Sequence, residues 1–298
     1  MFTCTRREAF LSVFFLLLTF FVFMATYHRD TIQDNITPLK YLIPAQSSSF
    51  SNTRESCVGE QKLHQDRIRL SRMLNSMKHN FSRQSCEMLE VRKKSGEKVN
   101  VGVSASGGWC RTASSSTGGN HIHDRPLAED LSKFFEGKAV ASFGDGPGDY
   151  KKYIDSTKRL RLYDAYDGAP YCKETSGGVV EFLDLTAPQY GLPLYDWIMS
   201  LEVAEHIPSM YEGIYIDNIA RHAKEGIVLS WAVPGQGGLS HVNNRPLDYV
   251  KKVLYEKGFA HDPESSKRLQ TVATLGWLRA NTNVYRRLPS SPANPRDA

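Results

Sequence analysis

Past residue 100 the sequence has no excess of charge of either sign. Residues 101–298 carry 22 basic and 23 acidic side chains, so the formal charge of +5 on the whole chain arises before that segment. A nucleic-acid-binding domain is expected to carry a basic surface, which this segment lacks. The sequence also lacks internal repeats, and its composition is not that of a collagen-like, wholly coiled-coil or wholly disordered chain. We therefore expect a globular domain whose partners do not include nucleic acid.

One stretch near the start has no charged residue at all. Residues 9–27 are uncharged and rich in Phe and Leu, and as a helix they would be about 28 Å long, close to the roughly 30 Å of a bilayer core. Arg6 and Arg7 precede this run, so the positive-inside rule places residues 1–8 in the cytosol and the rest across the membrane. A cleaved signal peptide is the alternative, but its apolar core is usually only about 7–15 residues long. The sequence predicts an uncleaved single-pass type II anchor.

Cysteine is scarce, and its distribution suits an oxidising compartment. After the anchor the cysteines form an even set, compatible with two disulfides in any of three pairings or with free buried thiols. Two glycosylation sequons begin at Asn35 and Asn80, as expected of a chain in the secretory lumen. The four cysteines are Cys57, Cys86, Cys110 and Cys172.

The rest of the chain divides into three parts. Residues 28–100 have loose helical periodicity and predict a lumenal stem, and residues 288–298, with three prolines, predict a disordered tail. Residues 101–287 alternate short apolar runs with helical or loop segments, which predicts an α/β fold with a mainly parallel sheet and helices on both faces. Ligands bind at the carboxyl ends of such strands. The apolar runs are 139–143, 160–163, 179–183, 197–201 and 227–231.

A glycine-rich turn follows the first apolar run. Gly144, Gly146 and Gly148 stand at alternating positions, with Asp145 between the first two. Such glycines let the backbone turn tightly and let a cofactor approach it closely.

Acidic residues follow the second and third runs. An acid about 20 positions after a glycine-rich turn can accept both hydroxyl protons of a ribose. Asp167 stands 19 residues beyond Gly148 and fits this role better than Asp164, for which a solvated strand position is expected. Asp184 ends the third run, where an acid that caps a helix is the alternative to a binding role.

The segment 101–287 resembles the class I S-adenosylmethionine-dependent methyltransferases. Besides the glycine-rich turn, the resemblance rests on the stretches Gly107–Cys110, Tyr166–Ala169, Ser200–Pro208 and Ser230–Asn243. It implies a Rossmann-like sheet and S-adenosylmethionine as the cofactor, with its methionine part wrapped by the glycine-rich turn.

The same resemblance implies roles for single residues. Asp167 would hold the ribose of the cofactor, and Asp184 would meet the adenine amino group. Many members of the family carry an acid two positions before the first glycine, where this chain has Ser142. We expect Asp145 to compensate for that departure, and we assign Glu202 to the cofactor as well.

A group of metal-ligand residues follows the fourth and fifth apolar runs. Glu202, Glu205 and His206 lie within five residues, and His241 comes after the fifth run. Carboxylates and imidazoles can bind a divalent cation, Mg or Mn, and the pattern resembles that of metal-dependent methyltransferases acting on hydroxyls. Such a cation lowers the pKa of an acceptor hydroxyl. Without metal, His206 or His241 would be the general base and Glu205 would shape the pocket.

These features together predict a function. We expect an O-methyltransferase for sugar hydroxyls of glycans, anchored in the Golgi membrane with its catalytic domain in the lumen. Trp109, Trp231 and Trp277 are candidates for stacking on a sugar face. The alternatives are a methyltransferase for a lipid or small metabolite at the membrane, and a methyltransferase-fold protein that only binds its ligands.

Overall fold

The structure, a computed structural model, describes residues 52–99, 102–110 and 121–289. The predicted cytosolic tail, the anchor at 9–27, the sequon at Asn35 and most of the C-terminal tail lie outside these ranges. Within them, no helix is both long enough and apolar enough to cross a membrane. The second sequon begins at Asn80, which is exposed on a helix.

A seven-stranded sheet organises the segment after residue 121. Its strand order is β3-β2-β1-β4-β5-β7-β6, and every pairing is parallel except those of β7 with β5 and β6. This is the Rossmann-like α/β sheet that the sequence predicts. The strands are β1 (Ala139–Phe143), β2 (Leu162–Asp167), β3 (Glu181–Phe182), β4 (Tyr195–Leu201), β5 (Ala223–Ser230), β6 (Phe259–Asp262) and β7 (Asn283–Arg287).

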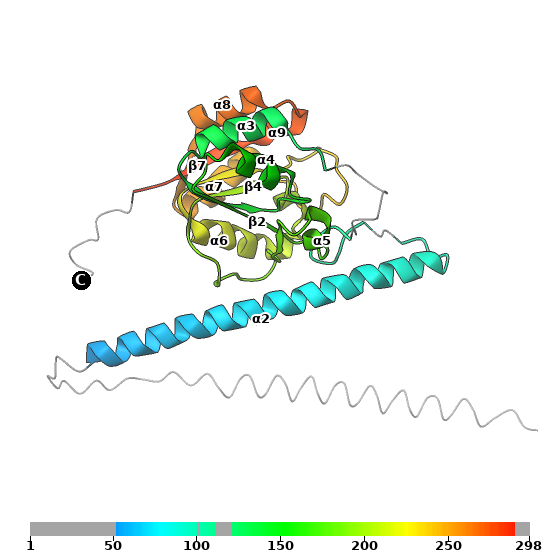
Figure 1. The fold of residues 1–298 in the computed structure, drawn as a ribbon, viewed down its shortest axis with the longest axis horizontal. Helices are drawn as coiled ribbons and strands as arrows, with labels where there is room; N and C mark the ends of the chain where they lie inside the picture. Colours follow the sequence, from blue (N-terminus) through cyan, green and yellow to red (C-terminus); the bar gives the residue numbers. More distant parts are fainter. Residues whose placement is uncertain (1–51, 100–101, 111–120, 290–298) are drawn as a thin grey trace, which may run out of the picture. The chain divides into compact units, whose positions relative to one another are not determined.

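Helices cover both faces of the sheet, so the central strands are apolar on both sides. Alternate residues of β1 point to opposite cores: Ala141 packs with the residues of α6 and α7, and Val140 packs with those of α3, α4, α8 and α9. Figure 1 shows α3, α4, α8 and α9 on one side of the sheet and α6 on the other. The helices are α3 (Arg125–Phe134), α4 (Asp149–Thr157), α5 (Cys172–Ser176), α6 (Glu212–His222), α7 (Leu247–Glu256), α8 (Pro263–Val272) and α9 (Gly276–Asn281).

The helix α2 (Asn52–Lys94) lies within the segment predicted as a stem. Its side chains contact the loop that follows β3: the Ser71 hydroxyl donates to the Pro188 carbonyl oxygen at 2.8 Å, and the Asn75 amide donates to the Phe182 carbonyl oxygen at 3.2 Å. The His79 ring stacks on the Phe182 ring at 4.1 Å between centroids. Part of the predicted stem is therefore packed on the sheet domain.

A disulfide joins α2 to the segment before the first strand. Cys86 pairs with Cys110, 24 residues further along the chain. Cys172 is buried and carries a free thiol, so the expectation of two disulfides among the four cysteines is wrong. The thiol is buried among apolar side chains at the start of α5 and donates to the Asp167 carbonyl oxygen at 3.8 Å. The side chain of Cys57 lies outside the described part of the structure.

Candidate active site

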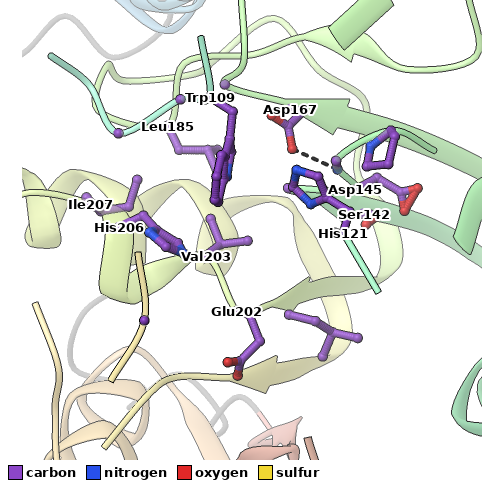
Figure 2. A pocket seen from close by; sticks show the side chains of 18 of the residues that line it. Trp109, His121, Ser142, Asp145, Asp167, Leu185, Glu202, Val203, His206 and Ile207 are labelled. Atoms are coloured by element: carbon purple, nitrogen blue, oxygen red, sulfur yellow. Dashed lines mark hydrogen bonds between the residues drawn. The ribbon is translucent and has the colours of Figure 1, made fainter. Parts of the chain in front are cut away.

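A cavity of about 470 Å³ opens at the carboxyl ends of the parallel strands. Its walls come from the turns that follow β1, β2, β3, β4 and β5, together with residues 106–109, 121–123 and 277–278. This is the edge of the sheet where the sequence predicts the ligand. Figure 2 shows side chains from these turns around one space.

The glycine-rich turn after β1 forms one wall. Gly144 has φ of +99°, and a Cβ there would lie 2.2 Å from the Val203 side chain, so only glycine fits. Gly146 also lines the cavity and closely approaches the His121 ring. Gly148 does not line the cavity, which corrects its assignment to the cofactor. Instead, it lets α4 approach the Val180 side chain, which a Cβ would meet at 3.0 Å.

Asp167 closes the end of β2 and fastens the glycine-rich turn. Its Oδ2 accepts a hydrogen bond from the Gly146 amide at 2.8 Å, the dashed line in Figure 2, and its Oδ1 accepts one from the Ala169 amide at 2.7 Å. Burial raises the pKa of Asp167, and these backbone donors oppose that shift. Each oxygen keeps a lone pair for a further donor. Asp164 lies away from the cavity, where it is half-buried rather than solvated and accepts from the Tyr195 hydroxyl at 2.7 Å.

Asp184 lies in the turn after β3, at another part of the cavity wall. Its Oδ1 accepts hydrogen bonds from both the amide and the hydroxyl of Thr186, at 2.8 and 2.5 Å. Its buried Oδ2 has no hydrogen-bond partner among the described residues, and Lys78 Nζ lies 3.9 Å away. Asp184 caps a turn and not a helix. The unpartnered oxygen suits a donor supplied by a ligand, because a buried acceptor without a partner is unfavourable.

Asp145 belongs to the glycine-rich turn, and its side chain lies beside Ser142 (Figure 2). Its carboxylate accepts hydrogen bonds from the Lys151 amide at 3.1 Å and the Tyr163 hydroxyl at 3.3 Å. Burial raises the pKa of Asp145 to about 7, and the negative charge of Asp167 adds to the shift. Asp145 is thus a buried acid on the cavity wall, next to Ser142.

His206 and His241 line the side of the cavity nearest β4 and β5, and the buried Glu205 lies close to both. One ligand atom from each lies within 4.8 Å of the others. A short helical turn after β4 (Ala204–His206) supplies Glu205 and His206, and the loop after β5 brings His241 to within 4.0 Å of the Glu205 carboxylate. Glu205 is fully buried, and neither of its oxygens has a hydrogen-bond partner among the described residues.

Burial has opposite consequences for the two buried groups. Burial, and then the nearby charge of His241, lower the pKa of His206 to about 4, so the His206 imidazole is neutral at physiological pH. Burial, and then the charge of Glu202, raise the pKa of Glu205 well above its ordinary value, which favours its neutral acid. A divalent cation would bind the neutral imidazole directly and would displace the proton of Glu205.

Glu202 is not among the residues whose ligand atoms lie within 4.8 Å of one another, although its charge acts on Glu205. The end of β4 turns at Glu202 with φ of +54°, and the Glu202 amide donates to the Ser230 hydroxyl at 2.7 Å. That turn directs the carboxylate toward Gln236, whose amide donates to Oε2 at 3.4 Å. Glu202 lines the cavity and remains a candidate for cofactor contact.

The segment 107–110 forms a further wall. A Cβ on Gly108 would lie 2.0 Å from the Gly168 carbonyl oxygen, so this backbone packs directly on the turn after β2. The adjoining Trp109 ring stands between His121 and His206 (Figure 2), in edge contacts of 5.1 and 6.1 Å between centroids. Of the three tryptophans proposed for sugar stacking, Trp109 and Trp277 line the cavity, whereas Trp231 is buried in the core against Tyr215.

Sequence reasoning missed the part that α2 plays in this site. Asn75 Oδ1 accepts a hydrogen bond from the Asp184 amide at 2.9 Å, and Lys78 Nζ donates to the Thr186 hydroxyl at 3.0 Å. These bonds hold the turn that carries Asp184. A stripe of polar residues at helical spacing was the available signal, namely Ser71, Asn75, Lys78 and Ser82.

The charge of the cavity wall has one sign. No Lys or Arg lines it within the described ranges, whereas five acidic residues do. Such a wall suits a cofactor that carries a sulfonium and an ammonium group and an acceptor without negative charge. The acidic residues are Asp145, Asp149, Asp167, Asp184 and Glu202.

No family model matches the chain, and no curated protein sequence matches it. The solved structures to which it is similar include methyltransferases. Magnesium protoporphyrin IX methyltransferase from Synechocystis PCC 6803, with bound SAH, is 14% identical over 58% of this chain and 90% of that one, with a TM-score of 0.41. The sugar N-methyltransferase KedS8 from Streptoalloteichus sp ATCC 53650 is 12% identical over 59% and 98%, with a TM-score of 0.45. An O-methyltransferase family protein from Burkholderia thailandensis is 15% identical over 56% and 57%, with a TM-score of 0.41.

Proposed function

We propose that the protein is an S-adenosylmethionine-dependent O-methyltransferase that acts on sugar hydroxyls of glycans in the secretory lumen. The observation that carries the proposal is the position of His206 and His241 on the same cavity as the glycine-rich turn, with the buried Glu205 carboxyl close to both. One side of the cavity has the features of a cofactor cradle, and the other has groups that can deprotonate or polarise an acceptor.

The cradle supports the choice of cofactor. Asp167 and Asp184 stand at the ends of adjacent strands and can accept hydrogen bonds from a ribose and from an adenine amino group. Asp145 and Glu202 supply negative charge near the glycine-rich turn, where the methionine part with its two cationic groups would lie. The ionised carboxylates would attract that part of the cofactor.

The cavity wall supports a neutral, hydroxylated acceptor. A phosphate or carboxylate on the acceptor would meet five acidic residues and no compensating cation among the described lining residues. Trp109 presents a flat apolar ring next to His206, which suits the apolar face of a sugar. The predicted anchor would place this site in a compartment where glycans are abundant.

Transfer of a methyl group to a sugar hydroxyl requires removal of its proton. Glu205, His206 and His241 would hold a divalent cation, and such a cation lowers the pKa of a hydroxyl that it binds. His206 Nδ1 lies 3.3 Å from the Ser240 carbonyl oxygen. If Nδ1 carries the proton, that bond leaves Nε2 of the neutral ring free to bind or to accept a proton.

A direct test uses the full-length protein, labelled S-adenosylmethionine and panels of glycans and lipids. We expect methyl transfer to glycans, its loss in EDTA, and its recovery with added Mg²⁺ or Mn²⁺. Glu205→Gln should abolish transfer while leaving the affinity for S-adenosylhomocysteine unchanged, and His64→Ala on the exposed surface of α2 is the matched control. Full activity in EDTA together with loss in His206→Ala would assign the proton to the imidazole and refute the metal. Transfer to lipids alone would refute the glycan acceptor.

The topology has its own test. A cytosolic N-terminus and a lumenal domain predict that intact microsomes protect residues 52–289 from added protease. They also predict a glycan at Asn80, which is exposed. Digestion of the domain in sealed microsomes would overturn the predicted orientation.

A further inference from the structure

The helix α2 carries an apolar seam on its exposed side. Its positions follow one another at alternating spacings of three and four residues, so that the pattern repeats every seven, and all but two of them, the polar Arg67 and Gln84, hold apolar side chains. These apolar side chains are between 38% and 66% exposed, which is unusual for side chains of this kind in such number. The seam consists of Leu63, Leu70, Leu74, Met77, Phe81, Met88 and Val91.

The seam lies on the side of α2 that faces away from the sheet domain. Residues at other positions of the repeat make the contacts with the domain, among them Ser71, Asn75, His79 and Cys86. On a helical wheel at 100° per residue, the average directions of the two sets are about 150° apart. None of the described residues covers the seam.

The seven-residue repeat identifies the kind of partner. Apolar positions that repeat every 3.5 residues match a second helix with the same repeat, because each side chain then fits between four of its partner's. The α2 helix of a second copy has the same repeat, so in a parallel pair the apolar positions of the two helices lie at the same height. We propose that α2 forms a parallel two-stranded coiled coil with α2 of a second copy of this chain.

The size of the seam is sufficient for a stable dimer. It extends over 29 residues, from Leu63 to Val91, or about 42 Å of helix. If each of its seven side chains buries on the order of 100 Å², the seam supplies roughly 700 Å² per partner, close to the roughly 800 Å² of a standard interface.

Charge and polarity favour the parallel arrangement. Exposed Glu87 and Arg92 flank the seam on opposite sides. In a parallel pair Glu87 of one copy lies next to Arg92 of the other, whose guanidinium also pairs with Glu97 of its own chain. Gln84 occupies a seam position, and it meets its own counterpart only when the helices are parallel and in register.

The first test measures the mass of the full-length chain in a nonionic detergent by light scattering. We expect twice the 33.6 kDa of one chain. The double variant Met77→Glu and Phe81→Glu should be monomeric, because it places four negative charges in the seam. Ser76→Glu, which is exposed on the same helix but outside the seam, should remain dimeric. A monomeric native chain, or a double variant that stays dimeric, would overturn the proposal.

The second test determines the direction of the helices. Met77→Cys is introduced into a chain in which Cys4 and Cys57 are replaced by serine, and the protein is oxidised. A parallel pair brings the two introduced thiols together, so we expect a covalent dimer, and Ser76→Cys in the same background should give none. A dimeric mass without a Met77→Cys cross-link would overturn the parallel arrangement.

Discussion

Replacing Asp184 with asparagine exchanges one carboxylate oxygen for an NH₂ group. The structure predicts how this exchange alters the affinity for the cofactor product. Oδ1 of Asp184 accepts hydrogen bonds from the amide and the hydroxyl of Thr186. In Asp184→Asn the side-chain oxygen must keep these two donors, so the new NH₂ group takes the position of the unpartnered Oδ2. An acceptor for the adenine amino group then becomes a donor that opposes it.

The expected loss follows from the kind of bond. A hydrogen bond to a charged group contributes about 1.5–3 kcal/mol, so the affinity for S-adenosylhomocysteine should fall by about 10- to 150-fold. The fold should persist, because the Thr186 bonds are kept and the side chain has the same size.

Calorimetric titration of the two proteins with two ligands tests this reasoning. S-inosylhomocysteine has a carbonyl in place of the adenine amino group, so Asp184→Asn should bind it more tightly than the native protein does. Asp164→Asn is the control, since Asp164 lies away from the cavity, and its affinities should not change. If Asp184→Asn bound both ligands as the native protein does, Asp184 would not contact the adenine ring.

Three further predictions concern the same cavity and its supports. The pKa of Asp145 is about 7 because of burial, so its carboxyl is neutral below that pH. The affinity for S-adenosylhomocysteine should therefore fall about 100-fold between pH 8 and pH 5, and Asp145→Asn should flatten this profile in calorimetry. Asn75→Ala should weaken the same affinity several-fold, because it releases the turn that carries Asp184, whereas Ser76→Ala should not. Burial raises the pKa of Glu205, so the metal-free folded state binds a proton more tightly than the unfolded state. The free energy of unfolding in EDTA should then decrease as the pH rises above the ordinary glutamate value, and Glu205→Gln should remove that part of the slope in thermal melts.

The turns at the ends of the parallel strands could be predicted from sequence because their signals are local. The first predicted run coincides with β1 (Ala139–Phe143), and the spacing from the glycine-rich turn separates Asp167 from Asp164 correctly as the acid on the cavity. The start of α3 is equally local, since the Asp124 side chain accepts a hydrogen bond from the Leu127 amide. Each of these features depends on residues within about 20 positions of one another.

The features that sequence reasoning missed depend on contacts between distant parts of the chain. Strands β6 and β7 pair antiparallel at one edge of the sheet, and none of the predicted apolar runs corresponds to either strand. The bond from Asn75 to the Asp184 amide joins residues 109 positions apart. The direction of the Glu202 carboxylate follows from a positive φ and from Gln236 on another loop. Residue type and spacing carry no information on such geometry.

The Cys86–Cys110 disulfide ties the wall that carries Trp109 to a helix, and this has a consequence for when the protein becomes competent. Without the disulfide, this wall would be held by its packing alone, with Gly108 against the Gly168 carbonyl oxygen and Gly107 against that of His206. Disulfides form in oxidising compartments and not in the cytosol. The closure of the cavity beside Trp109 would therefore depend on the redox state of the compartment in which the chain folds.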